Sequence, residues 1–141
     1  MILLDTCVIS EFARPAPDPA VVAWMATVPD AALRISALTV GEIHKGAELL
    51  EPGPRRDRVE AWLSGLQSTY ADRILPVDTR VAAAWGRLSG HLRRTGTPRP
   101  PIDSLLAATA LCHGLRLATR NIRDFDSTGV LLINPWEHPP L

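Results

Sequence analysis

The sequence predicts an α/β protein, a three-layer sandwich in which a mostly parallel sheet of about five strands carries helices on both faces. Two observations lead to this prediction. Short apolar segments typical of buried strands alternate along the chain with longer segments whose apolar residues recur at helical spacing. A strand, a helix and a further strand in succession form a parallel βαβ unit, so the alternation favours one parallel sheet. With 141 residues, the chain is expected to form one domain over residues 1–141.

The expected strands are short and rich in aliphatic residues. The first expected strand is apolar at every position and does not alternate with polar residues, which is typical of a strand buried on both faces. Pro76 lies within the third and predicts that this strand ends there or lies at the edge of the sheet. In chain order, the strands are expected at residues 2–4, 33–35, 74–77, 115–119 and 130–133.

The expected helices are bounded by residues that cap helices or end them. Asp18 and Pro19 form a typical helix start, and Asp78 or Thr79 starts a later helix. Gly114 is the residue type that often follows the end of a helix. The helices are expected at residues 6–13, 19–28, 39–50, 59–66, 79–92 and 103–113.

The composition limits the classes of function. Fifteen basic and fifteen acidic residues give a net charge of zero, so long-range attraction to nucleic acid is not expected. The longest apolar runs are too short to cross a membrane, and no signal peptide is recognised, so a cytoplasmic location is expected. Cys7 and Cys112 lack metal-site or redox spacing and are expected to be reduced, largely buried thiols.

Three acidic residues stand where three different segments should meet. Asp5 ends the first strand, and Asp103 opens a helix. Glu42 is expected in the first turn of a helix begun by residues 36–39, with capping-box spacing from Thr39. In an open α/β sheet, strand ends and helix N-termini converge at the carboxyl edge. Clustered carboxylates repel one another, and a hard divalent cation such as Mg²⁺ relieves that repulsion. We therefore expect a metal site formed by Asp5, Glu42 and Asp103.

Each acid also has a structural explanation of its own. Asp5 and Asp103 could stabilise helix N-termini, and Glu42 could complete the capping box. Three independent caps at three converging points are a weaker explanation than one site. The two readings also coexist, because a helix N-terminus keeps a carboxylate ionised and ready to bind a metal.

A fourth polar segment follows the fourth strand at the same end of the sheet. Asn121 offers an amide oxygen and Asp124 a carboxylate, although Asp124 could equally be a solvated turn residue. Arg120 and Arg123 beside them are candidate phosphate contacts, or exposed residues without such a role.

Other chemistries fit less well. A haloacid-dehalogenase-type phosphatase needs a second Asp two residues after the first, where this chain has Cys7. The sequence lacks a phosphate-binding Gly-rich loop, a dinucleotide fingerprint and a Ser nucleophile elbow. The four histidines have no zinc-ligand spacing with the cysteines.

Five segments resemble the motifs of PIN-domain ribonucleases of the VapC type. The likeness covers essentially the whole chain, and the order and spacing of the motifs carry it. The first four segments match the four family motifs, and the last is similar to the FitB-like branch. They are residues 2–11, residues 36–43 with Gly46, residues 103–110, residues 119–121 with Asp124 and Phe125, and residues 134–136.

The resemblance implies a PIN-like fold and an endoribonuclease that depends on Mg²⁺ or Mn²⁺. It also implies a homodimeric toxin that a cognate antitoxin holds inactive. Asp5 and Asp103 would bind the metal directly, Glu42 would bind it or position the attacking water, and Asp124 would be a fourth acid. The antitoxin is expected to place an Arg or Lys among Asp5, Glu42 and Asp103, because a guanidinium binds carboxylates bidentately.

The chain departs from the family pattern at two positions. Cys7 stands where Asn is usual, which removes an amide that could have supported Asp5. Asn121 stands where some relatives have Asp, so that role passes to Asp124, passes to water, or is lost.

Two other functions stay open at this stage. The protein could be a non-catalytic partner or corepressor in an antitoxin–DNA complex, its acidic cleft only receiving a basic segment. It could also be a nuclease of related architecture that acts on DNA. A metal-dependent cleavage assay that offers both nucleic acids separates the three functions.

Overall fold

The computed structural model describes residues 1–137. Its centre is a five-stranded sheet in the order β3-β2-β1-β4-β5, with every neighbouring pair parallel. The predicted α/β class and the predicted sheet are therefore confirmed, and β3 lies at an edge, as Pro76 indicated. The strands are β1 (Ile2–Leu4), β2 (Leu33–Ser36), β3 (Ile74–Leu75), β4 (Arg116–Ala118) and β5 (Leu132–Ile133).

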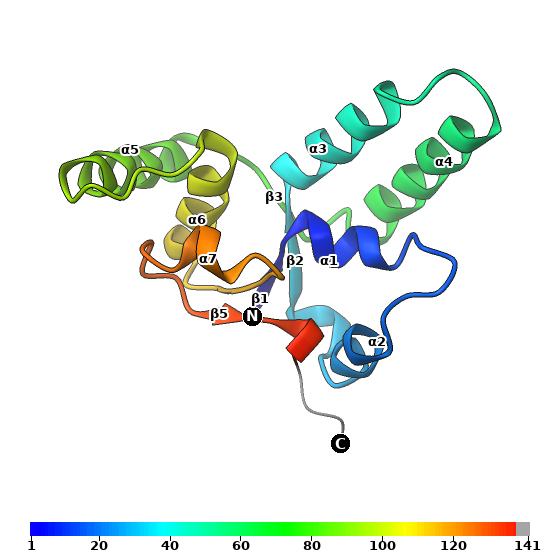
Figure 1. Cartoon of the computed structure of the whole chain (residues 1–141), viewed down its shortest axis with the longest axis horizontal. Helices are drawn as coiled ribbons and strands as arrows, with labels where there is room; N and C mark the ends of the chain where they lie inside the picture. The colour runs from blue at the N-terminus through cyan, green and yellow to red at the C-terminus, as the bar shows by residue number, and fades with distance from the viewer. Residues whose placement is uncertain (138–141) are drawn as a thin grey trace.

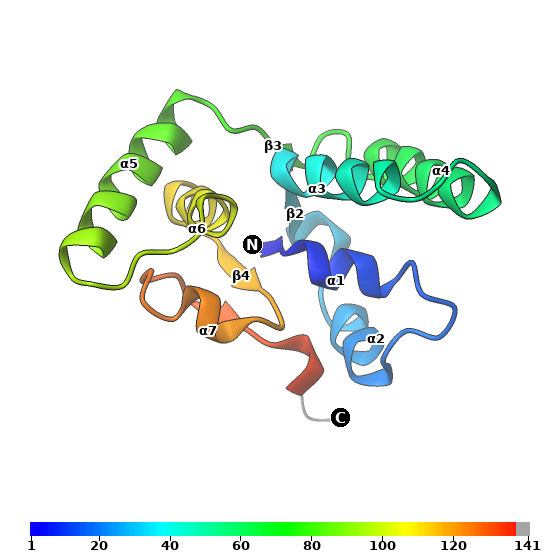
Figure 2. The ribbon, with the colours of Figure 1, turned by 45° about the horizontal axis from the view of Figure 1, so that its top comes forward.

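Helices cover both faces of the sheet. Figures 1 and 2 show α1 to α4 on one side of the strands and α5 to α7 on the other. None of the helices within residues 1–137 combines the length and the apolar character needed to span a membrane. The α-helices are α1 (Thr6–Glu11), α2 (Pro19–Ala26), α3 (Ala37–Glu48), α4 (Pro54–Thr69), α5 (Thr79–Arg94), α6 (Pro101–His113) and α7 (Ile122–Phe125), and the 3₁₀ turns are η1 (Asp30–Ala32) and η2 (Pro135–Glu137).

Two hydrophobic cores lie on opposite faces of the central strand. Ile2 and Leu4 belong to the core shared with α1 to α4, whereas Leu3 belongs to the core shared with α6 and α7. Alternate residues of a strand point to opposite faces, so an apolar run of three residues serves both cores. This burial holds the carboxyl end of β1, and the residue that follows it, at the middle of the molecule.

The helix starts follow the predicted caps at two positions. The side chain of Asp18 accepts a hydrogen bond from the Ala20 amide at 2.8 Å, and that of Asp78 accepts one from the Val81 amide at 3.0 Å. Gly114 adopts the left-handed conformation after α6, with a φ of 65°. That conformation is strained for residues with a Cβ, which explains glycine at this position.

The predicted capping box of Thr39 and Glu42 at the start of α3 is wrong, although the helix does begin within residues 36–39. Ser36 caps this helix, and its hydroxyl accepts a hydrogen bond from the Leu38 amide at 3.0 Å. Because β2 runs directly into α3, Thr39 lies inside the helix with no exposed surface, and Glu42 lies in the second turn instead of the first. Glu42 is therefore not a capping residue, and its carboxylate is available for other contacts.

Candidate active site

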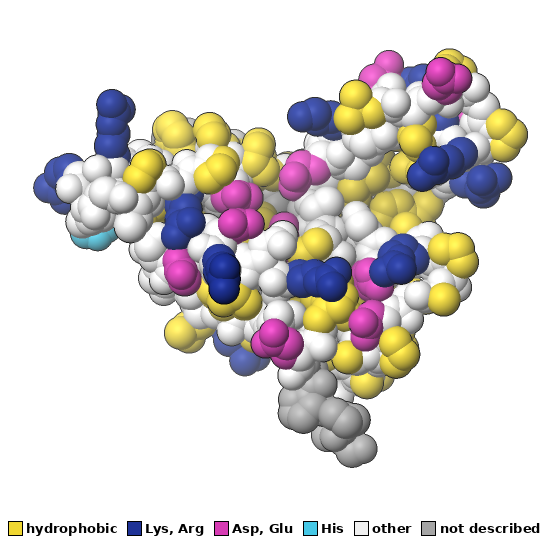
Figure 3. Space-filling model, viewed as in Figure 1, with side chains coloured by type: hydrophobic (Ala, Val, Ile, Leu, Met, Phe, Trp, Pro, Cys, Tyr) yellow, Lys and Arg dark blue, Asp and Glu magenta, His cyan; other side chains and the backbone are white. Residues whose placement is uncertain are grey.

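Four acidic side chains from four segments lie within electrostatic reach of one another. Asp5 follows β1, Glu42 is on α3, Asp103 is in the first turn of α6, and Asp124 is on α7. Burial raises the pKa of the Asp103 carboxyl, and the charges of Asp124, Asp5 and Glu42 raise it further. Figure 3 shows acidic side chains gathered near the centre of one face of the molecule. The fold thus brings all four predicted acids into one cluster, which we call the acid cluster.

Three donors hold the carboxylate of Asp5, which is 9% exposed. The Thr6 amide donates to Oδ1 at 2.7 Å, so Asp5 also caps α1. The Thr119 hydroxyl donates to Oδ2 at 2.7 Å from the end of β4, and the Cys7 thiol lies 3.6 Å from the same oxygen. Hydrogen bonds to a carboxylate are stronger than neutral ones, so this set fixes the direction in which Asp5 points.

Cys7 replaces the expected amide with a thiol that performs part of the same task. Burial and the charge of Asp5 raise the pKa of Cys7 to about 11, so the thiol stays protonated near neutral pH and can donate to Asp5. Its sulfur also accepts a hydrogen bond from the Arg120 amide at 3.5 Å. The departure from the family pattern at position 7 therefore does not leave Asp5 without support.

Glu42 is oriented by a hydroxyl that the sequence did not single out. The Thr6 hydroxyl donates to Oε1 of Glu42 at 2.7 Å and lies 3.2 Å from the hydroxyl of Thr39. Thr6 thus binds one acid through its side chain and Asp5 through its backbone. A hydroxyl residue directly after a strand-end Asp was the only sequence signal for this role, and it is a weak one.

The fourth segment is tied to Asp5 through Thr119. The backbone amide of Asn121 donates to the Thr119 hydroxyl at 3.0 Å, and that hydroxyl donates in turn to Asp5. The Asn121 side chain is exposed and makes no hydrogen bond within residues 1–137. Asp124 is also exposed, and its charge raises the pKa of Asp103 more than that of any other acid.

The arginines near the acid cluster differ in whether they are already paired. Arg99 binds Asp126 at 2.8 Å and Ser127 at 3.1 Å, and its charge opposes the rise in the pKa of Asp103. Arg120 and Arg123 are exposed and form no ion pair within the described residues, and they line one shallow pocket with Asn121 and Asp124. The sequence did not identify Arg99 as a neighbour of this site.

The oxygen ligands of the acid cluster suit a hard cation, although the carboxylates are not arranged around a common point. Four carboxylates offer only oxygen, the ligand that Mg²⁺ prefers, and their mutual repulsion contributes to the raised pKa of Asp103. In the described part of the chain, no three acidic, His or Cys side chains stand close enough together to hold a metal ion. Thr6 donates to Oδ1 of Asp5 and to Oε1 of Glu42, so a cation that took these oxygens as ligands would replace or share both hydrogen bonds.

Comparisons with known proteins agree with this architecture. The sequence model of the PIN domain family matches residues 2–131. The chain is 38% identical to Toxin FitB of Neisseria gonorrhoeae over 96% of its length and 99% of that protein. It is 37% identical to VapC ribonuclease Y4jK of Sinorhizobium fredii over 97% of its length and 99% of that protein. A structure of FitAB bound to an IR36 DNA fragment superposes with a TM-score of 0.90 at 36% identity, covering 97% of this chain and 96% of the other. This chain therefore belongs to the PIN-domain family, among the VapC ribonucleases and FitB toxins.

Proposed function

We propose that this protein is a metal-dependent endoribonuclease that acts as the toxin of a toxin–antitoxin pair. The observation that carries the proposal is the placement of four acids on four segments of the fold, with Thr6 contacting both Asp5 and Glu42. Relatives that match most of the chain are named a ribonuclease and a toxin. An acid cluster of this kind is suited to hydrolysis of a phosphodiester bond with the help of a divalent cation.

Each acid has a role in this proposal. Asp5 and Asp103 bind Mg²⁺, or Mn²⁺ in its place, and Glu42 binds the metal or orients the attacking water. Such a cation lowers the pKa of a bound water and offsets the charge of the scissile phosphate. Asp124 supplies the fourth carboxylate at the exposed rim. Thr119 and Thr6 set the directions of Asp5 and Glu42.

The substrate in this proposal is RNA, held by local contacts because the chain has a net charge of zero. Arg120 and Arg123 are exposed beside the acid cluster and can each bind a phosphate, with Asn121 as a polar contact between them. Single-stranded RNA exposes its phosphates and bases more than a duplex does, so a loop is the expected target.

The partner in this proposal is a cognate antitoxin that inserts a basic side chain into the acid cluster. A guanidinium forms paired hydrogen bonds with carboxylates, so it competes with the cation for the same oxygens. The similarity to the chain in the FitAB structure supports such an assembly. We further expect a homodimer in the cytoplasm, as in the family pattern that the motifs resemble.

The test is cleavage by the purified, antitoxin-free protein. RNA should be cut in Mg²⁺ or Mn²⁺ and spared in a chelator, and Asp5→Asn or Asp103→Asn should lower the rate by at least about 100-fold. Asp57→Asn is the matched control, because Asp57 is an exposed acid in the first turn of α4. Full activity of a folded Asp5→Asn variant would contradict the assignment.

The same assay separates a second candidate function. The second candidate is a corepressor that has no nuclease activity. It is suggested by the similar structure of FitAB, which is bound to DNA. A corepressor would leave both RNA and DNA uncut in every metal while still increasing the affinity of the antitoxin for DNA. Cleavage of DNA but not RNA would instead identify a DNA-directed nuclease.

A further inference from the structure

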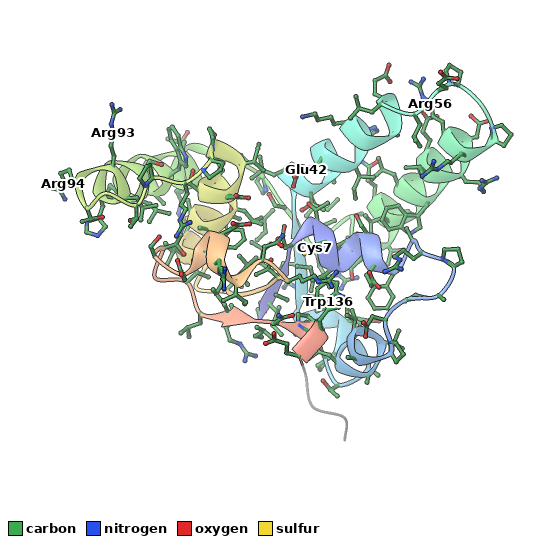
Figure 4. The ribbon with its side chains drawn as sticks, in the orientation of Figure 1. Cys7, Glu42, Arg56, Arg93, Arg94 and Trp136 are labelled. Atoms are coloured by element: carbon green, nitrogen blue, oxygen red, sulfur yellow. The ribbon has the colours of Figure 1, made fainter. Side chains whose placement is uncertain are left out.

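Arg120 is fixed to the rest of the molecule at two points, one at its backbone and one at its side chain. Its amide donates to the Cys7 sulfur at 3.5 Å, and that sulfur lies 3.6 Å from Oδ2 of Asp5. Its guanidinium carbon lies 5.3 Å from the centroid of the Trp136 ring. In the view of Figure 4, the labelled Cys7 lies between Glu42 and Trp136.

We propose that Trp136 is a positioning residue, which holds the guanidinium of Arg120 beside the acid cluster so that it binds an RNA phosphate next to Asp5. The inference rests on the proposed function, because it concerns how the same site takes its substrate. It assigns a task to the C-terminal turn η2, which supplies none of the acids.

Trp136 is itself held firmly enough to act as a platform. Its amide donates to the side-chain oxygen of Asn134 at 3.0 Å, which closes the turn η2, and Pro135 in the same turn is buried. The indole is partly buried and packs against the hydrophobic core that includes Ile2 and Trp24. A ring fixed by core packing offers one defined face, so the cation above it has one preferred position.

A cation–π contact leaves hydrogen-bond donors of the guanidinium unused. The ring attracts the positive charge of the group, whereas a phosphate binds its N–H groups through hydrogen bonds. Arg120 has no ion-pair partner among residues 1–137, whereas Arg14 binds Glu11 and Arg99 binds Asp126. Arg120 is therefore both oriented and free to bind an anion.

The surroundings make the exact placement of this cation important. The shallow pocket beside Arg120 also contains Arg123 and two acids, Asp124 and Glu137. These acids repel a phosphate, so an arginine that moved freely would spend part of its time near them instead of near the substrate. The cation–π contact with Trp136 restricts this movement, whereas Arg123 has no such aromatic contact within the described residues.

The experiment measures RNA binding separately from cleavage. The full-length chain with Asp103→Asn serves as the parent, because it lacks one acid of the proposed metal site and should not cut the probe. The probe is a fluorescein-labelled single-stranded RNA of mixed sequence, followed by fluorescence anisotropy over a range of salt concentrations. Into this parent we place Trp136→Leu, Trp136→Phe, Arg120→Ala and the double change of Trp136→Leu with Arg120→Ala.

Removal of the ring should raise the Kd by about two- to fivefold, the range expected for an exposed cation–π contact. Arg120→Ala should raise the Kd at least as much and reduce the slope of log Kd against log salt by about 0.7, the value for one phosphate contact on a single strand. Trp136→Phe, which keeps a smaller ring and most of the packing, should lie between the parent and Trp136→Leu. The double variant should bind no more weakly than Arg120→Ala, because Trp136 acts through Arg120.

Kinetics with the wild-type acids provide the second measurement. Trp136→Leu and Trp136→Phe should raise KM and leave kcat almost unchanged, since the acids themselves are untouched. Arg116→Ala is the matched control, because Arg116 is an exposed arginine at the opposite end of β4. It should leave Kd, the salt slope and KM at their parent values.

Three outcomes would overturn the inference. One is equal RNA binding by the parent and by both folded Trp136 variants, with Trp136→Phe deciding if Trp136→Leu does not fold. Another is a further loss of affinity when Trp136→Leu is added to Arg120→Ala, because Trp136 would then act independently of the arginine. The third is no RNA binding by the parent at all. Failure of the proposed nuclease function gives a different result. In that case the wild-type chain leaves RNA uncut in the presence of Mg²⁺ or Mn²⁺, regardless of how the variants bind RNA.

Discussion

The Asp5 carboxylate accepts hydrogen bonds from its immediate neighbours in sequence and from one residue that is 114 positions away. The distant donor, Thr119, is completely buried, and its hydroxyl is in turn bound by the Asn121 amide at 3.0 Å. A buried carboxylate that loses such a donor keeps the cost of desolvation without the compensating hydrogen bond. At the scale of single residues, the orientation of the acid cluster therefore depends on hydroxyl and thiol groups that carry no charge.

The first prediction concerns Thr119→Val, which keeps the shape of the side chain and removes the hydroxyl. The free energy of unfolding should fall by about 1–3 kcal/mol, because a buried charge-assisted hydrogen bond is lost. Loss of a residue that orients a metal ligand should also weaken metal binding by about 10- to 100-fold. Chemical denaturation and a titration of nuclease activity with Mg²⁺ measure the two effects.

Thr128→Val is the control for this prediction. Thr128 is another buried threonine, and its hydroxyl donates to the Phe125 carbonyl at 2.6 Å, outside the acid cluster. This variant should lose stability and keep its response to Mg²⁺. If Thr119→Val responded to Mg²⁺ as the wild type does, Thr119 would be a structural residue only.

Each acid of the cluster belongs to a different secondary-structure element. Asp5 joins β1 to α1, Glu42 lies on α3, Asp103 opens α6 and Asp124 lies on α7. These elements pack on both faces of the sheet. The negative charges of the acid cluster therefore act between the two layers of helices, as the raised pKa of Asp103 indicates. Without a cation, the like charges oppose this approach, and a cation bound there would link the layers.

The second prediction follows from this repulsion between elements. A cation that binds only the folded chain stabilises it by mass action, by about 2.7 kcal/mol at a concentration 100 times the Kd. For a domain of this size, that corresponds to a rise in Tm of roughly 5–10 °C. Melting curves recorded over a range of Mg²⁺ and Mn²⁺ concentrations measure the effect, and Glu42→Gln should reduce it.

The matched control is Glu51→Gln, which alters an exposed acid just after α3. It should leave the metal-induced shift in Tm unchanged. A wild-type Tm that did not respond to either cation would show that the four carboxylates do not form a metal site.

Over the whole molecule, positive charge is spread across the surface, because most of the basic residues form no ion pair within the described residues. The net charge is zero, and Arg14, Arg56, Arg73 and Arg99 are each within 4.0 Å of a carboxylate oxygen. The acid cluster therefore attracts cations and basic side chains, and the arginines beside it attract phosphate. An antitoxin that inserts a basic residue would occupy the first of these regions and block access to the second.

The third prediction concerns this competition. Asp124→Asn removes the exposed acid whose charge raises the pKa of Asp103 the most, so it should weaken both the cleavage rate and the inhibition by the cognate antitoxin. Asn121→Ala removes no charge and should change both less. Inhibition constants and cleavage rates for the two variants, measured side by side, check the expectation. Unchanged values for Asp124→Asn would mean that only three acids form the site.

The sequence alone determined the fold class, the order of the five strands and the six longer helices, and the segments that carry the acids. It did not predict the short helix α7, and it placed α4 in only part of its observed range. The properties that it determined depend on short-range patterns: apolar periodicity, proline and glycine positions, and capping residues such as Asp18 and Asp78. The convergence of Asp5, Asp103 and Asp124 followed from one general rule about the carboxyl ends of parallel strands. The start of α3 was a further exception, because Ser36 and Thr39 are both good caps and only the end of β2 decides between them.

The tertiary structure alone decided which side chains contact the acids. Thr119 reaches Asp5 across 114 residues and Thr6 reaches Glu42 across 36. Arg120 is joined to Cys7 through its amide and to Trp136 through its guanidinium. Contacts of this kind leave no periodic signal in the chain, because they depend on the rotamers and packing of residues that become neighbours only after the sheet has formed.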